Sequence, residues 1–144
     1  MVKEPAGCGA FPRAQRRALE LRGSKVLLVR STAEGLAVRL SALLHVSAGL
    51  PGTDRGTVWE QEVELVLRDG RATETPPEGT LWITEGFVHT PAGRRSQLAS
   101  EGELRGPVRL ELRGDEGALT AAGGDLDIVP RGDPRFLDRF EGAA

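Results

Sequence analysis

The chain has 144 residues, of which 39% are hydrophobic and 28% charged, with a formal net charge of −2 at pH 7. This composition predicts a folded domain with its own core rather than a disordered segment. The slight acidic excess and the scarcity of aromatic residues argue against a nucleic-acid partner, because such proteins concentrate positive charge on one face. No apolar run reaches the ~18–20 residues that a membrane-spanning helix needs, so we expect no membrane partner.

The first residues differ in character from the rest of the chain. Residues 1–11 contain Gly, Ala and Pro without periodicity, and we interpret them as a flexible leader to a single β-rich domain over residues 12–144. They lack the apolar centre of a signal peptide, so a cytoplasmic protein is expected, although a mature form with its leader removed would look the same. Cys8 is the only cysteine, which excludes an intrachain disulfide, and no neighbouring base activates its thiol.

Two apolar stretches flank Gly23-Ser24. Residues 17–22 alternate between polar and apolar side chains, and residues 25–30 are apolar on both sides. Glycine followed by serine between such stretches is a signal for a two-residue hairpin turn, because glycine accepts the positive φ that this turn requires. The sequence therefore predicts a hairpin with its turn at Gly23-Ser24.

Residues 35–46 show the clearest periodicity in the chain. Every even position is apolar, and Arg39, Ser41 and His45 occupy odd positions. A period of two predicts a strand with one buried face. A helix over residues 33–48 is the alternative, since Ser31 and Glu34 have capping-box spacing, and it would make the fold α+β. The strand is favoured because the helix would place Arg39 on its apolar face.

A second strand is predicted over residues 58–68, after an irregular connection at residues 47–56. Its apolar face carries Trp59, Gln61, Val63, Leu65 and Leu67. Glu60, Glu62 and Glu64 lie on its other face, which we interpret as solvated, with Arg39 of the neighbouring strand as a cross-strand partner. Asp69-Gly70 is a strong turn signal.

The second half of the chain reads as short strands divided by turns. Residues 80–89 form a predicted strand in which Gly86 indicates a bulge or a close approach of another backbone. Residues 97–105 are too mixed to assign. The chain then continues with three short predicted strands, at residues 107–113, 118–122 and 125–129. Glycine-rich turns separate these strands, and together they are predicted to form a meander.

The predicted last element is a short helix over residues 133–142. Asp133 is a suitable N-cap, Pro134 suits the first helical position, and Gly142 suits the position after the last turn. Phe136 and Phe140 are four residues apart and would share one face of that helix. The predicted fold is all-β, mainly an antiparallel β-sandwich or small barrel, with this short C-terminal helix.

The sequence contains no motif for catalysis, metal binding or cofactor binding. Only two histidines occur, His45 and His89, and neither lies at metal-ligand spacing. The row of glutamates at 60, 62 and 64 is compatible with general acid–base chemistry, but a solvated sheet face has the same pattern. No phosphate loop, dinucleotide fingerprint or nucleophile elbow is present. We therefore nominate no catalytic residue, no metal ligand and no cofactor.

Candidate ligand-binding residues are Trp59, Trp82, His45, Arg39 and Glu60. The tryptophans are either core side chains or the wall of a groove, a role that suits an aromatic ring with a polar edge. The favoured function is a non-catalytic binding or regulatory module that contacts a protein partner or a second copy of the chain. The alternatives are a small carboxylate-based hydrolase or isomerase near Glu60, Glu62 and His45, and a carbohydrate- or lipid-binding sandwich.

Overall fold

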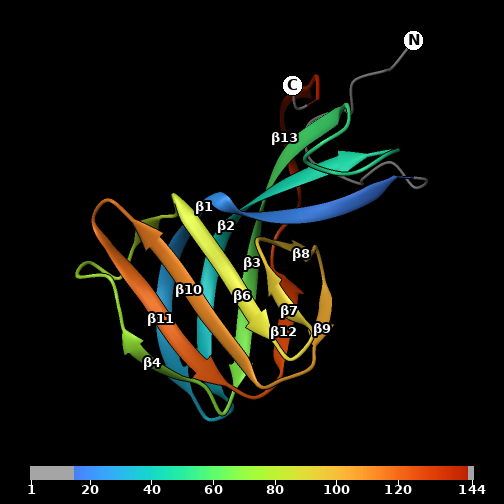
Figure 1. Ribbon diagram of the computed structural model, residues 1–144. Helices are drawn as coiled ribbons and strands as arrows, with labels where there is room; N and C mark the ends of the chain where they lie inside the picture. The colour runs from blue at the N-terminus through green and yellow to red at the C-terminus, as the bar shows by residue number, and fades with distance from the viewer. Residues whose placement is uncertain (1–14, 143–144) are drawn as a thin grey trace.

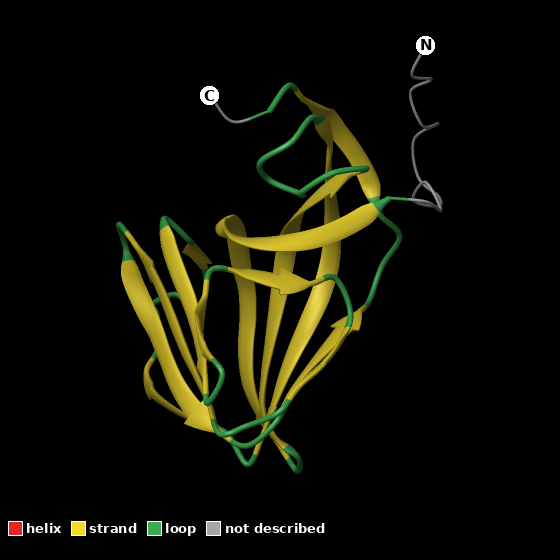
Figure 2. Ribbon diagram, turned by 45° about the vertical axis from the view of Figure 1, so that its right-hand side comes forward, coloured by secondary structure: helices red, strands yellow, loops and turns green. Residues whose placement is uncertain are grey.

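A computed structural model describes residues 15–142, which form strands and loops but no helix (Figures 1 and 2). The strands make two antiparallel sheets that face each other, one of eight strands (sheet A) and one of five (sheet B). The prediction of an all-β antiparallel fold is confirmed. The predicted leader over residues 1–11 lies outside the described residues.

Sheet A runs in the order β5–β1–β2–β3–β12–β9, with β8 also paired to β1 and β13 also paired to β3. Its strands are β1 (Arg16–Thr32), β2 (Gly35–Ser47), β3 (Gly56–Arg68), β5 (Leu81–Trp82), β8 (Gln97–Ala99), β9 (Gly102–Leu104), β12 (Leu126–Pro130) and β13 (Arg135–Phe140). Sheet B runs in the order β4–β11–β10–β6–β7. Its strands are β4 (Arg71–Glu74), β6 (Glu85–Thr90), β7 (Gly93–Arg95), β10 (Val108–Gly114) and β11 (Gly117–Gly123).

Strand β2 lies inside sheet A, between β1 and β3. All of its even positions from Leu36 to Val46 are buried, as the period of two predicts. The alternative helix over residues 33–48, and with it the α+β fold, is therefore wrong. The core lies between the sheets, where leucines and valines of β2 and β3 meet Leu110, Leu112 and Leu119 of sheet B. Burying each such side chain contributes about 1.5–3 kcal/mol.

Strands β1, β2 and β3 continue past the sandwich into an extension that also holds β8 and β13 (Figure 1). The predicted hairpin at Gly23-Ser24 is wrong, because β1 runs through these residues as one strand. Gly23 does have a positive φ of 92°, but it belongs to a bulge at which Glu20 pairs with Leu43 and Lys25 pairs with Ser41. Glycine followed by serine therefore marks a bend within one strand here, and not a reversal of the chain.

Ser24 bridges the gap that this bulge opens between β1 and β2. Its hydroxyl donates to the carbonyl of Glu20 at 2.5 Å and accepts a hydrogen bond from the amide of Leu43 at 2.9 Å. The side chain thereby satisfies backbone groups that the regular ladder would have paired. On the opposite edge of β1, the partner changes from β8 at residues 18–20 to β5 at residues 25–26.

The predicted C-terminal helix is also wrong, since Arg135–Phe140 is the strand β13. Strand β12 pairs with β3 only along residues 63–67, which leaves the same edge of β3 open at residues 56–60. β13 completes this edge, and Phe136 lies opposite Trp59 with the ring centroids 5.6 Å apart. A two-turn helix is marginal in water, so pairing with an open strand edge outweighs the local capping signals.

Part of the predicted meander is confirmed. β10 and β11 form a hairpin around Gly114 and Gly117, but the next strand, β12, crosses to sheet A instead of pairing with β11.

Asp69, with a φ of 55°, lies in the turn where the chain passes from β3 of sheet A to β4 of sheet B. The unassigned residues 97–105 contain β8 and β9. The sequence pattern identified β10, β11 and β12 as strands, while the choice of sheet depends on contacts distant in sequence.

Candidate functional site

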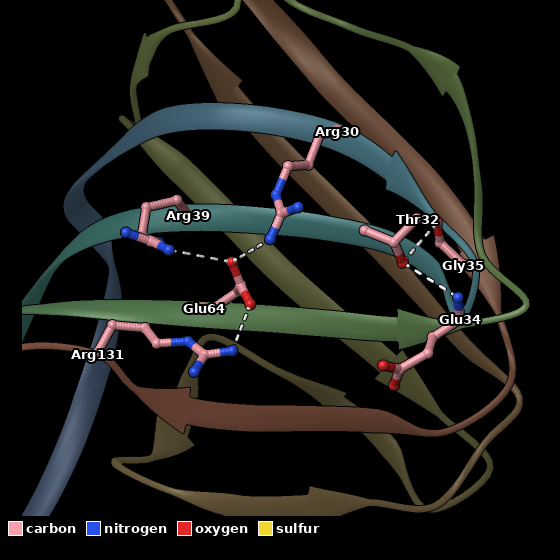
Figure 3. Close-up of polar contacts among 7 residues, drawn as sticks. All are labelled: Arg30, Thr32, Glu34, Gly35, Arg39, Glu64 and Arg131. Atoms are coloured by element: carbon pink, nitrogen blue, oxygen red, sulfur yellow. Dashed lines mark hydrogen bonds and ion pairs between the residues drawn. The ribbon is translucent and has the colours of Figure 1, made fainter.

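The most unusual polar group in the described chain is a buried glutamate surrounded by three arginines (Figure 3). Glu64 of β3 is only 3% exposed. Its Oε1 lies 2.8 Å from Arg131, and its Oε2 lies 3.3 Å from Arg30 and 3.4 Å from Arg39. We call Arg30, Arg39 and Arg131 the arginine cluster. The predicted pairing of Arg39 with the acidic row is confirmed, because Arg39 lies directly opposite Glu64 in the β2–β3 register.

The arginine cluster keeps Glu64 ionised. Hydrogen bonds from the guanidiniums, above all that of Arg131, hold the pKa of the Glu64 carboxyl below its usual range, while burial acts in the opposite direction. Three positive charges surround one negative charge, so the group carries a positive excess. Because Arg39 alternates with the buried side chains of β2, the cluster lies on the side of sheet A that faces away from sheet B, which we call the outer face (Figure 3).

Two exposed apolar side chains lie on the same outer face, beside the arginine cluster. Trp82 of β5 is 64% exposed, and Leu28 of β1 is 49% exposed. Lys25 lies opposite Trp82 in the β1–β5 register, with its Nζ 5.5 Å from the ring centroid, and Leu28 lies opposite Arg39. The structure therefore brings together Trp82 and Arg39, two of the five candidate ligand-binding residues, on adjacent parts of one surface.

The other three candidate residues lie in the extension. Trp59 is fully buried, packs edge-on against Phe136, and donates a hydrogen bond from its indole nitrogen to Thr57 at 2.8 Å. Its ring is thus a core side chain and has no exposed surface. Glu60 is bound by Arg135 of β13.

His45 is half-buried on β2 and packs edge-on against Phe140, with the ring centroids 4.9 Å apart. Burial lowers the pKa of His45, and the negative charge of Glu20 opposes this effect in part. Its Nδ1 is buried and has no hydrogen-bond partner among the described residues. Each of these three residues is therefore tied to its own neighbours, and they do not form one site with Trp82 and Arg39.

Sequence reasoning missed a second charged group, on the outer face of sheet B. Glu111 of β10 lies 2.5 Å from Nε2 of His89 and 3.2 Å from Arg109, with Arg113 at 3.8 Å. The alternation of Arg109, Glu111 and Arg113 could have placed these three residues on one face. The contact with His89 depends on the pairing of β6 with β10, which no local signal reports.

Residues 15–142 contain no group of three or more His, Cys, Asp or Glu side chains that could hold a metal ion. The same residues contain no helix that is long and apolar enough to cross a membrane. Comparison of the chain with protein-family models, with curated proteins and with solved structures finds no match in any of the three.

Proposed function

We propose that the protein is a non-catalytic binding module that recognises an acidic segment of a partner protein with the outer face of sheet A. The observation that carries the proposal is the exposure of Trp82 and Leu28 beside the arginine cluster. Tryptophan and arginine are enriched among the residues that dominate protein–protein binding energies. Exposed apolar side chains flanked by charge are typical of interaction surfaces.

The charges on this face determine the kind of partner. In the part of this face beside Trp82, Lys25, Arg30, Arg39 and Arg131 supply four positive charges against the two negative charges of Glu62 and Glu64. Farther along the same face, Arg68 is paired with Asp127 and Glu60 with Arg135. A partner segment rich in Asp and Glu, with an apolar side chain to cover Trp82, complements this surface. Glu64 also holds the guanidiniums in place, which reduces the conformational entropy they lose on binding.

The test is selection of binders from a displayed library of random 12-residue peptides, using the wild-type protein as bait. We expect the selected peptides to be rich in Asp and Glu, with at least one large apolar residue. Their affinity should fall as salt concentration rises, because salt screens exposed charges. Trp82→Ala should weaken binding roughly 30-fold or more, as the loss of a hot-spot side chain does.

Leu50→Ala is the matched control, because Leu50 is 55% exposed but lies in the connection between β2 and β3, outside this surface. It should leave affinity unchanged. The proposal is contradicted if no peptide is enriched, if the enriched peptides are not acidic, or if they bind the Trp82→Ala variant as tightly as the wild-type protein.

A further inference from the structure

An open hollow of about 700 Å³ lies where the β6–β7 hairpin of sheet B meets β1 and β8 of the extension. We call it the junction hollow. Its size falls within the range of small-molecule sites, about 300–1,000 Å³. It shares no residue with the arginine cluster or with Trp82 and Leu28, and it is lined by Glu20, Phe87, Arg94, Arg95, Ser96 and Gln97.

One side of the junction hollow is positively charged. Arg94 lies over the ring of Phe87, with its Cζ 4.2 Å from the ring centroid. This cation–π contact restrains the guanidinium, whose N–H groups suit a bidentate contact with a carboxylate or phosphate. Within residues 15–142, neither Arg94 nor Arg95 forms an ion pair.

Glu20 and Gln97 supply hydrogen-bond acceptors to the same hollow. They lie opposite each other in the β1–β8 register, and the side-chain amide of Gln97 donates both to Glu20 and to the carbonyl of Pro51, the latter at 2.9 Å. Both donors of Gln97 are thereby engaged within the protein, and its orientation is fixed. Its carbonyl oxygen and the second carboxylate oxygen of Glu20 remain as acceptors, and the hydroxyl of Ser96 adds another polar group.

From this combination we infer that the junction hollow binds a small polyhydroxylated anion, that is, a sugar phosphate or a sugar acid. The anionic group lies against Arg94, which the contact with Phe87 restrains, and the hydroxyl groups donate to Glu20 and Gln97. An inorganic anion leaves these acceptors without donors, and a neutral sugar leaves the Arg94 guanidinium without an anion. The inference is independent of the proposed protein partner, because the two surfaces share no residue.

Isothermal titration calorimetry on the full chain tests the inference with four probes: glucose 6-phosphate, glucuronate, glucose and inorganic phosphate. We expect at least one of the two anionic sugars to bind about tenfold or more tightly than either fragment, since each added hydrogen-bonded group contributes to affinity. The two anionic sugars distinguish a tetrahedral phosphate from a planar carboxylate as the preferred group.

Variants locate the binding site. Arg94→Ala should weaken binding of the anionic sugar roughly 10- to 100-fold, because it removes a charge-assisted bidentate contact. Arg71→Ala is the matched control, since Arg71 is exposed on β4, at the opposite edge of sheet B, and it should leave affinity within about twofold.

Glu20→Gln keeps the size of the side chain and should weaken the anionic sugar more than inorganic phosphate. The inference is overturned if neither anionic sugar binds, if glucose or inorganic phosphate binds as tightly as the better-bound anionic sugar, or if the Arg94→Ala variant binds that sugar like the wild-type protein. Thermal unfolding of each variant checks that the fold is retained.

Discussion

At the scale of single residues, Glu64 shows how a side chain on a formally solvated face becomes buried. Its cover consists of three arginine side chains rather than of a second layer of the protein, and each guanidinium contacts one carboxylate oxygen. Removing the negative charge leaves three neighbouring positive charges without their common partner. Loss of Glu64 alone should therefore destabilise the fold, because it leaves the arginine cluster without its partner, and the same group is part of the proposed binding surface.

Glu64→Gln should lower the free energy of unfolding by about 1–3 kcal/mol, the usual effect of losing hydrogen bonds to a charged group. Urea denaturation at pH 7 measures the change. Glu62→Gln, on the same strand and the same face but exposed, is the control and should change stability by less than about 0.5 kcal/mol. Equal effects of the two substitutions would show that the arginine cluster does not stabilise the fold.

Acid should remove the same contribution. The pKa of Glu64 is lowered in the folded state, so the unfolded state takes up a proton first. The stabilisation is therefore complete above the unfolded pKa of about 4.5 and is lost as the pH falls through the folded pKa. The difference in stability between the wild-type protein and the Glu64→Gln variant should shrink below about pH 4.5.

His45 predicts a separate pH dependence at higher pH. Its pKa is also lowered in the folded state, so protonation favours the unfolded chain. The free energy of unfolding should decrease as the pH falls below about 6.5, until the lowered folded pKa is reached. Thermal unfolding at pH 8 and pH 5 measures this decrease, and His45→Gln should make it smaller. An unchanged decrease in that variant would assign the effect to other groups.

At the scale of elements, the strands that could be read from the sequence are those whose environment is regular along their own length. β2, β3 and β10 alternate because one face is buried throughout, and this period is local information. The prediction of a helix over residues 133–142 is wrong because the capping residues indicate only what the isolated segment prefers. The edge of β3 that β13 completes is distant in sequence, so no local pattern indicates it. Turn residues likewise show where the chain changes direction, but they do not show which sheet the following strand joins.

The same limit applies to the candidate site. The sequence pairs Arg39 with the acidic row of Glu60, Glu62 and Glu64, because they lie on consecutive strands predicted to be neighbours, but it does not single out Glu64. Arg30 and Arg131 could not be paired with Glu64 from the sequence, since the first follows a bulge and the second follows β12, whose place in sheet A no local signal reports. The burial of Glu64 depends on these two side chains, so the sequence pattern alone indicates a solvated residue.

Ser24→Ala tests the role of the bulge in β1. The substitution removes a buried hydroxyl that joins the carbonyl of Glu20 to the amide of Leu43, and it should lower the free energy of unfolding by about 1–3 kcal/mol. Ser41→Ala, on the outer face of β2, provides the comparison and should have little effect. If chemical denaturation finds the two variants equally stable, the hydroxyl is not needed to maintain the bend.

At the scale of the whole molecule, β1, β2 and β3 belong to both the sandwich and the extension. The β2–β3 ladder runs from one part to the other without interruption, and β1 pairs with β2 on both sides of its bulge, so neither part has a complete sheet of its own. We therefore predict that residues 15–142 unfold as one cooperative unit.

The Trp82→Phe variant leaves Trp59, in the extension, as the only tryptophan, so its fluorescence reports on that part. Circular dichroism reports on all strands. The two denaturation curves should coincide, with one midpoint. Two separate midpoints would show that the extension unfolds independently of the sandwich.

The way in which β3 is completed has a consequence for the chain during its synthesis. β1, β2 and β3 can pair with one another once residue 68 has left the ribosome, but the remaining edge of β3 is covered only by β12 and β13, which require residues 126–140. Until then, a strand of thirteen residues presents unpaired backbone groups. The nascent polypeptide thus passes through an interval in which it is exposed to edge-to-edge aggregation, and that interval ends only when its final strands emerge.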